Sequence, residues 1–230
     1  MLSQIFYLLL ISIILLVFLI RYIYKSQKNE NLGYIQKEDF NSNIFVPIEE
    51  YNEPFFKNLN FKEAFFHFSG LDSLGRAGIA NAVIDKIMIN SLYKADSRKF
   101  EHIPYRPTGF NQREYEEING GYLYNRCHLI GYQLISNNDV RNLITGTRDF
   151  NINGMLPIEN AIFEFIKNED GIVKYEVTPD FRKDELVARG VYIKAVGLVG
   201  KEIRLKINVY IKNIQKEIKI DYKTGASRKE

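Results

Sequence analysis

The order of the expected strands and helices is the feature that most constrains the fold of this chain. Several short runs rich in aliphatic or aromatic residues, with glycines at many of their ends, precede one well-marked helix, and similar runs follow it. The expected strands are residues 78–84, 122–129, 142–147, 172–179, 187–199 and 203–211. Because alternating βαβ units would place a helix between successive strands, this order predicts an α+β domain with a central, mostly antiparallel sheet.

The single helix is expected from Met155 to about Asn168. Pro157 falls in its first turn, where proline is tolerated, and Gly171 ends the run. Its broad apolar face consists of Ile158, Ile162, Phe163, Phe165 and Ile166. The last expected strand, 203–211, alternates apolar and polar residues, as a strand with one buried face does.

The N-terminal segment is apolar at every position from Ile5 to Ile20 except Ser12. A membrane-spanning helix needs about 20 such residues, so residues 5–24 are expected to form a transmembrane helix. A cleaved signal peptide is the alternative, but no basic start and no A-x-A-like cleavage site is present. The expected organisation is an anchor or uncleaved signal over 1–25, a linker and lead-in over 26–60, a compact domain over 61–224 and a tail over 225–230.

Composition and charge exclude several classes of protein. With 46% hydrophobic and 26% charged residues, the chain is neither fully disordered nor collagen-like nor a multi-span membrane protein. Its single cysteine excludes an internal disulfide. The net charge of +3 belongs to residues 1–29, which hold three bases and no acid, and leaves 28 bases and 28 acids beyond them. The global charge therefore gives no support to nucleic-acid binding.

Residues 201–230 are the one strongly basic stretch, with nine bases and four acids. This local excess of five positive charges could lie beside a polyanion. It could equally be a solvated strand face followed by a solvated tail.

His128 has the richest surroundings of the three histidines. On a strand, alternate side chains share a face, so Arg126 and His128 are expected to point one way with Tyr124, while Asn125 and Cys127 point the other way. A cation beside a potential base suits one site. Cys127 cannot readily pair with His128 as a nucleophile, and a small buried residue is its simplest interpretation.

A stretch dense in asparagine, residues 142–160, ends on the expected helix. Glu164 lies one turn beyond Asn160, so the two share a helical face. Amide and carboxylate oxygens suit a hard cation such as Mg²⁺, which often keeps most of its waters at phosphate-processing sites. The alternative is that the asparagines form turns and that the histidine is structural.

The string Asn125-Arg126-Cys127-His128-Leu129-Ile130 resembles the D-R-G-H motif of the DNA/RNA non-specific endonucleases, which belong to the ββα-metal (His-Me finger) superfamily. The surrounding sequence resembles the Gram-positive branch that includes membrane-anchored DNA-entry nucleases and streptococcal DNases. The matching stretches are residues 71–76, 106–109, 122–134, 142–160 and 220–225, which together span about 155 residues. The resemblance implies a ββα-metal finger core.

The resemblance also implies roles for individual residues. His128 would be the general base, Arg126 would hold phosphate, and Asn160 would bind the metal. Asn151 would support the site. Glu164 would contact metal-bound water.

Arg106 stands where the family often has a basic residue and would bind substrate phosphate. The sequence departs from the family pattern at three places: Asn125 replaces aspartate, Cys127 replaces glycine, and Phe110-Asn111 stands where relatives often have Trp-His. The first two departures remove neither the base nor the metal ligand. The third puts any role of that position in doubt.

The expected function is metal-dependent, sequence-non-specific hydrolysis of phosphodiester bonds in DNA, with RNA also open as a substrate. The expected cofactor is Mg²⁺, with Mn²⁺ as an alternative. A catalytically inactive, membrane-tethered DNA receptor on the same fold is the second hypothesis, and a structural surface protein is the third.

The expected side of the membrane follows from the predicted nuclease activity more than from the basic residues that flank the apolar segment. The bases after the apolar segment favour a cytoplasmic domain by the positive-inside rule. A non-specific nuclease facing the cytoplasm would attack the cell's own nucleic acid, so we expect a single-pass cell-membrane protein with an extracellular nuclease domain. If the N-terminal segment is cleaved, the domain is secreted.

Overall fold

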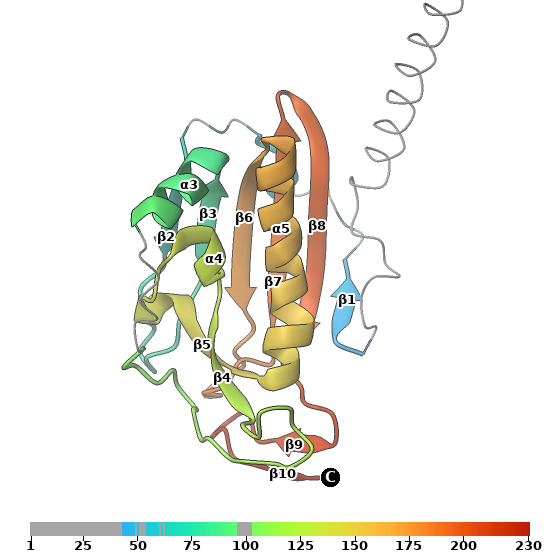
Figure 1. Cartoon of the computed structure of the whole chain (residues 1–230). Coiled ribbons are helices and arrows are strands. Elements are labelled where there is room, and N and C mark those ends of the chain that lie inside the picture. The colour runs from blue at the N-terminus through green and yellow to red at the C-terminus, as the bar shows by residue number, and fades with distance from the viewer. Residues whose placement is uncertain (1–42, 49, 51–53, 60, 62, 96–102) are drawn as a thin grey trace, which may run out of the picture. The chain divides into compact units, whose positions relative to one another are not determined.

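A six-stranded antiparallel sheet forms the centre of this computed structural model, which describes residues 43–48, 50, 54–59, 61, 63–95 and 103–230 (Figure 1). The strands lie in the order β1-β8-β7-β6-β3-β2, and each adjacent pair is antiparallel. Their bounds are Phe45–Pro47 (β1), Phe65–Phe68 (β2), Ala80–Ile84 (β3), Ile172–Pro179 (β6), Gly190–Val199 (β7) and Glu202–Lys212 (β8). The predicted α+β class and central antiparallel sheet are confirmed.

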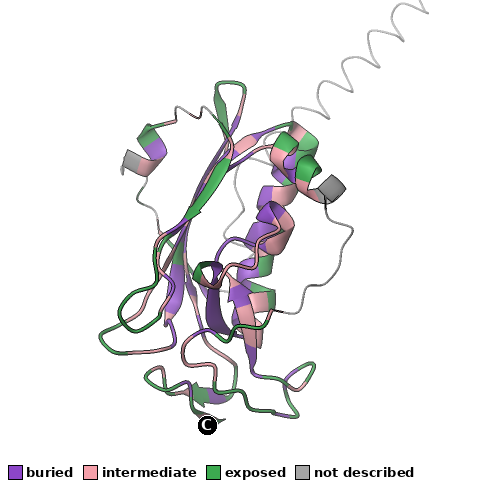
Figure 2. Cartoon of the chain, turned by 90° about the vertical axis from the view of Figure 1, so that its left-hand side faces the viewer, coloured by how far each residue is buried: buried purple, intermediate pink, exposed green. Residues whose placement is uncertain are grey.

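Helix α5, Leu156–Glu169, lies along one face of this sheet (Figure 1). Buried and partly exposed side chains alternate along β6 because every second residue of a strand points toward the helix. Seen edge-on, the sheet and α5 enclose a buried layer (Figure 2). From α5 and β6 this core includes Ile158, Ile162, Phe165, Ile166, Val173, Tyr175 and Val177. The predicted apolar face of the helix therefore packs on the sheet.

The opposite face of the sheet carries the short helix α2, Pro54–Lys57. Lys174 points away from the core, and its Nζ donates hydrogen bonds to the carbonyl oxygens of Phe55 (3.1 Å) and Asn58 (3.4 Å). Strand β1 pairs with β8. Both α2 and β1 lie within residues 26–60, which were predicted to be a linker and lead-in.

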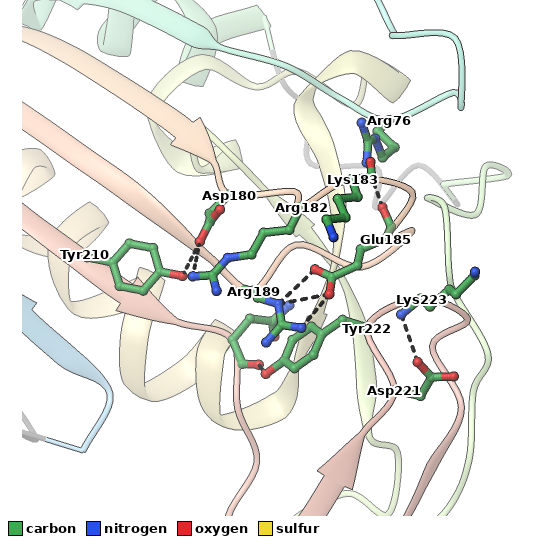
Figure 3. A network of polar contacts seen from close by, with 11 residues as sticks. Arg76, Asp180, Arg182, Lys183, Glu185, Arg189, Tyr210, Asp221, Tyr222 and Lys223 are labelled. Atoms are coloured by element: carbon green, nitrogen blue, oxygen red, sulfur yellow. Dashed lines mark hydrogen bonds and ion pairs between the residues drawn. The ribbon is translucent and has the colours of Figure 1, made fainter.

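The predicted strands are present with shifted ends. The expected strand 187–199 begins only at Gly190, because the backbone N–H groups of Leu186 and Val187 donate to Tyr222 O instead of joining the sheet. A network of polar contacts holds this loop, in which Glu185 pairs with Arg189 and Asp180 accepts a hydrogen bond from Tyr210 Oη (Figure 3).

The C-terminal residues belong to the folded domain and are not a tail. Strands β9, Ile218–Ile220, and β10, Ser227–Lys229, form an antiparallel pair. Ser227 holds β10 in place, because its Oγ accepts from Tyr115 Oη and its carbonyl oxygen from Arg113 Nη1. Several bases of 201–230 form ion pairs with other described residues: Arg204 with Glu202, Lys216 with Glu217, Lys223 with Asp184, and Lys229 with Glu117. This pairing reduces the positive charge available to a polyanion.

The expected transmembrane segment, residues 5–24, and His102 lie outside the described residues. None of the helices that the structure describes is long and apolar enough to cross a membrane.

Candidate active site on the β4–β5–α5 unit

Strand β4 and the helix that follows β5 carry four of the six predicted site residues, and Arg106 and Asn151 lie outside them. Strand β4, Tyr124–His128, pairs antiparallel with β5, Leu143–Thr147, and the pair lies beside α5 (Figure 1). This is the expected ββα arrangement. The connection between the strands contains the short helices α4, Tyr132–Ile135, and η2, Val140–Asn142.

Buried Asn142 fixes that connection against the end of β4. Its Oδ1 accepts from the N–H of Ile130 (2.9 Å), and its Nδ2 donates to the carbonyl oxygens of Ile130 (3.0 Å) and Asn137 (3.2 Å). An amide can make these three bonds at once because it offers both an acceptor and two donors. The residue that follows Asn137 is therefore held close to β4.

That residue, Asn138, orients the imidazole of His128. His128 Nε2 lies 2.9 Å from Asn138 Oδ1. Because a carbonyl oxygen can only accept, Nε2 carries the proton and the neutral ring has its lone pair on Nδ1. Burial lowers the pKa of His128 below its ordinary value, and the hydrogen bond to Asn138 opposes this only in part. The ring is thus a neutral, oriented base at pH 7.

Cys127 points away from His128 into the core, as the strand alternation predicted. It is fully buried, and burial raises the pKa of its thiol well above the usual range. A thiol of this kind is not a nucleophile at neutral pH.

Arg126 lies on the face of β4 opposite to Cys127, and two contacts hold its side chain. Its Nε donates to the carbonyl oxygen of Tyr105 (2.7 Å), and its guanidinium lies over the ring of Phe110, with 5.1 Å between Cζ and the ring centroid. Arg126 lines a pocket of about 440 Å³ together with Arg106 and Arg148. The structure therefore brings Arg106 and Arg126 together, as expected.

The segment that carries Arg106 is fixed by its neighbours. Thr108 Oγ1 donates to Leu186 O (2.6 Å), and Thr108 O accepts from Thr145 Oγ1 of β5 (2.8 Å). Gly109 has φ +67°, and a Cβ there would come within 2.5 Å of a methyl group of Val187, so the close packing of this segment requires glycine. The loop that contains Leu186, to which Thr108 is hydrogen-bonded, is itself held by the polar contacts of Figure 3, such as the ion pair of Glu185 with Arg189.

Asn160 and Glu164 lie on one exposed face of α5. Asn160 Oδ1 accepts from Gln133 Nε2 of α4 (2.9 Å), and Glu164 Oε2 accepts from Asn168 Nδ2 (2.7 Å). No group of three or more His, Cys, Asp or Glu side chains that could hold a metal occurs among the described residues. A cation at Asn160 would therefore have one oriented amide oxygen, with water and phosphate completing its shell, which fits hydrated Mg²⁺.

Asn151 lies in a π-helix, η3, Phe150–Met155, that leads into α5. Its carbonyl oxygen accepts from the N–H of Leu156 five residues later, which is the hydrogen bond that defines a π-turn. Its side chain is half-buried and has no hydrogen-bond partner within the described part of the chain. Such turns are frequent at functional sites.

Sequence reasoning missed Asn138, Gln133 and Glu159. The contacts of the first two join residues 10 and 27 positions apart, and no sequence period links them. Glu159 is 9% exposed, and its carboxylate occupies the place that a Cβ at Gly131 would take. Burial raises the pKa of Glu159 to about 8, so it is protonated at neutral pH.

Comparisons with known proteins agree with this fold. A family model described as DNA/RNA non-specific endonuclease matches residues 59–196. The Sda1 nuclease with a bound zinc ion has a similar fold, with TM-score 0.68 and 24% identity over 82% of this chain and 97% of that chain. NucA from Streptococcus agalactiae with magnesium bound gives TM-score 0.63 and 22% identity over 82% and 84%. A comparison with curated proteins found no match.

Proposed function

Because the chain belongs to the DNA/RNA non-specific endonuclease family, we propose that this nuclease hydrolyses phosphodiester bonds with His128 as general base and one divalent cation held by Asn160. The observation that carries the proposal is the His128–Asn138 hydrogen bond, which leaves a lone pair on Nδ1 of a neutral ring. Arg126 on the same strand and Arg106 in the segment before it line one pocket, and they are the proposed phosphate ligands.

In the proposed reaction, Nδ1 of His128 accepts a proton from water while the water oxygen attacks phosphorus. The bond from phosphorus to the 3′ oxygen breaks, and the products carry a 5′-phosphate and a 3′-hydroxyl. The lowered pKa of His128 keeps the base free of a proton at pH 7. Arg126 and Arg106 stabilise the negative charge that develops on the phosphoryl oxygens.

Asn160 would hold the cation through Oδ1, with Glu164 accepting a hydrogen bond from a bound water. When bound, the cation supplies charge neutralisation at the phosphate and at the departing oxygen. Magnesium and zinc, named for the two streptococcal-type structures above, support a divalent ion. The all-oxygen donor set favours Mg²⁺ over softer metals.

Low sequence specificity follows from the kind of contact that the site offers. Arginine contacts to phosphate position a strand without reading its bases. The proposed substrate class is DNA, and RNA stays open as a second substrate because phosphate contacts do not read a 2′-hydroxyl.

The test is cleavage of supercoiled plasmid by wild type and by His128→Ala, with and without Mg²⁺. We expect His128→Ala to lose cleavage and keep the wild-type melting temperature. His67→Ala is the matched control, because His67 is exposed on the edge strand β2 and its loss should leave activity intact. Substantial cleavage by His128→Ala would exclude the base assignment. A wild type that binds DNA without cutting it would instead indicate the inactive-receptor hypothesis.

A further inference from the structure

The pocket at the N-terminal end of β4 offers more than two phosphate-binding side chains. We call it the arginine pocket; its lining includes Arg106, Phe110, Tyr122, Asn125, Arg126 and Arg148. None of its ten lining residues is acidic. Three arginines in one concavity with no counter-charge focus a positive potential there.

These arginines remain free to bind an anion. Arg148 has only a long contact to a neutral acceptor, Asn125 Oδ1, at 3.4 Å. Arg126 uses Nε on a backbone carbonyl, which leaves its terminal nitrogens available. Arg106 has no hydrogen-bond or ion-pair partner within the part of the chain that the structure describes.

Asn125 also lines this pocket, and its Oδ1 lies beside Arg148. Its Nδ2 is buried and has no hydrogen-bond partner, a state that costs free energy. Asn125 was expected on the opposite face from Arg126, but the pocket extends around the end of β4 to Arg148, which follows β5. An aspartate at this position would form an ion pair with Arg148, whereas Asn125 offers it only a neutral oxygen.

Aromatic rings complete the pocket. Tyr122 is 55% exposed at its rim. Phe110 is fixed between the Arg126 guanidinium and the ring of Tyr124, with the ring centroids 6.3 Å apart. Exposed aromatic rings beside a basic groove are what single-stranded nucleic acid stacks on.

The volume of the pocket indicates whether its ligand is a single phosphate or a larger group. About 440 Å³ exceeds the space that one phosphate fills and lies within the range of small-molecule sites. A nucleotide can enter such a concavity only after it leaves the base stack of a duplex. Arg126 and His128 are two residues apart on β4, or about 7 Å along the strand, so the occupant lies next to the phosphodiester at His128.

We propose that the arginine pocket binds an unpaired nucleotide that flanks the scissile phosphodiester, with its phosphate on Arg148 and its base against Tyr122, while Arg106 and Arg126 contact the scissile phosphate. Unpaired strands are then cleaved in preference to duplex. The inference rests on the proposed nuclease function and specifies the form of its substrate.

The test compares kcat/KM on three substrates: a single-stranded oligonucleotide, its duplex, and bis(4-nitrophenyl) phosphate, which carries no flanking nucleotide for Arg148 and Tyr122 to bind. We expect the wild type to prefer the single strand. Tyr122→Ala should lower kcat/KM on the single strand about tenfold, as loss of one base–aromatic stack does, and leave the small diester unchanged. Asn125→Asp should act in the same way, because its carboxylate pairs with Arg148. Tyr192→Ala removes another exposed tyrosine, 42% exposed, from β7 and should change nothing.

Binding of a fluorescein-labelled single strand, measured by anisotropy in EDTA, gives a readout independent of cleavage. We expect Tyr122→Ala and Asn125→Asp to weaken it and Tyr192→Ala to leave it unchanged. If the variants lower activity on all three substrates equally, or on none, the nucleotide site is refuted while the nuclease stands. If the wild type cleaves nothing, the proposed function itself fails.

Discussion

Replacing Asn138 by leucine tests whether one hydrogen bond selects the active form of His128. Leucine has nearly the shape of asparagine but cannot accept the bond that Nε2 donates over 2.9 Å. A buried donor left without a partner costs about 1–3 kcal/mol. The variant ring avoids this cost by moving its proton to Nδ1 or by rotating, and both changes remove the base. We therefore expect kcat to fall about 5- to 150-fold, with little loss of stability.

Asn138→Asp is the matched variant, because it keeps the acceptor and adds a negative charge. The sign of the pH effect follows from the wild type. Burial places the pKa of His128 below its ordinary value, so activity rises with pH through a midpoint below about 6.5. A carboxylate at Nε2 stabilises the protonated ring and raises that pKa. We expect the acidic limb to move to higher pH while activity well above neutrality is retained.

The assay is kcat/KM for a fluorogenic oligonucleotide across pH, with thermal unfolding of each variant as the control for folding. Full activity of Asn138→Leu at neutral pH would refute the role of this bond. So would an acidic limb in Asn138→Asp that does not move from its wild-type position.

Four further outcomes are expected. Asn160→Ala should lose activity that raised Mg²⁺ restores only in part, measured as a Mg²⁺ titration of plasmid cleavage; insensitivity of the wild type to chelator would contradict the metal assignment. Gly146→Ala should destabilise the fold by about 1–3 kcal/mol in urea unfolding, because its Cβ would meet Cys127 Sγ and lie 2.5 Å from Phe150 Cδ1; adding Cys127→Gly should recover part of the loss. The raised pKa of Glu159, about 8, means that the stability it contributes is complete below about pH 4.5 and is lost as pH rises through 8. Glu159→Gln should remove that loss, about 5 kcal/mol, and an unchanged pH profile of stability would count against a buried carboxylic acid. Protease treatment of intact cells should remove the nuclease domain if it is extracellular, and protection of the domain would indicate the opposite orientation.

The long elements of the fold could be predicted because their signals are local. The helix at 156–169 and the long strands β6 and β8 carry repeating apolar patterns that report one buried face. Short elements such as β1, β2 and α4 have three or four residues each, too few for a period. Their structure depends on neighbours that are distant in sequence, so it could not be predicted.

Local geometry also determined part of the candidate site. Alternation along β4 separates Cys127 from Arg126, and helical spacing sets Asn160 and Glu164 on one face. These relations depend only on the covalent repeat of a strand and a helix. The family motif added expected roles for the same residues.

Only the tertiary structure decided the chemical state of those residues. The tautomer and the lowered pKa of His128 come from Asn138 and from burial, and the charge of the arginine pocket comes from Arg148 meeting Asn125 rather than a carboxylate. Hydrogen bonding and desolvation depend on which groups the packed chain brings within a few ångströms. The sequence by itself therefore determined which groups share a face, whereas packing decided which of them are neutral, charged or left without a partner.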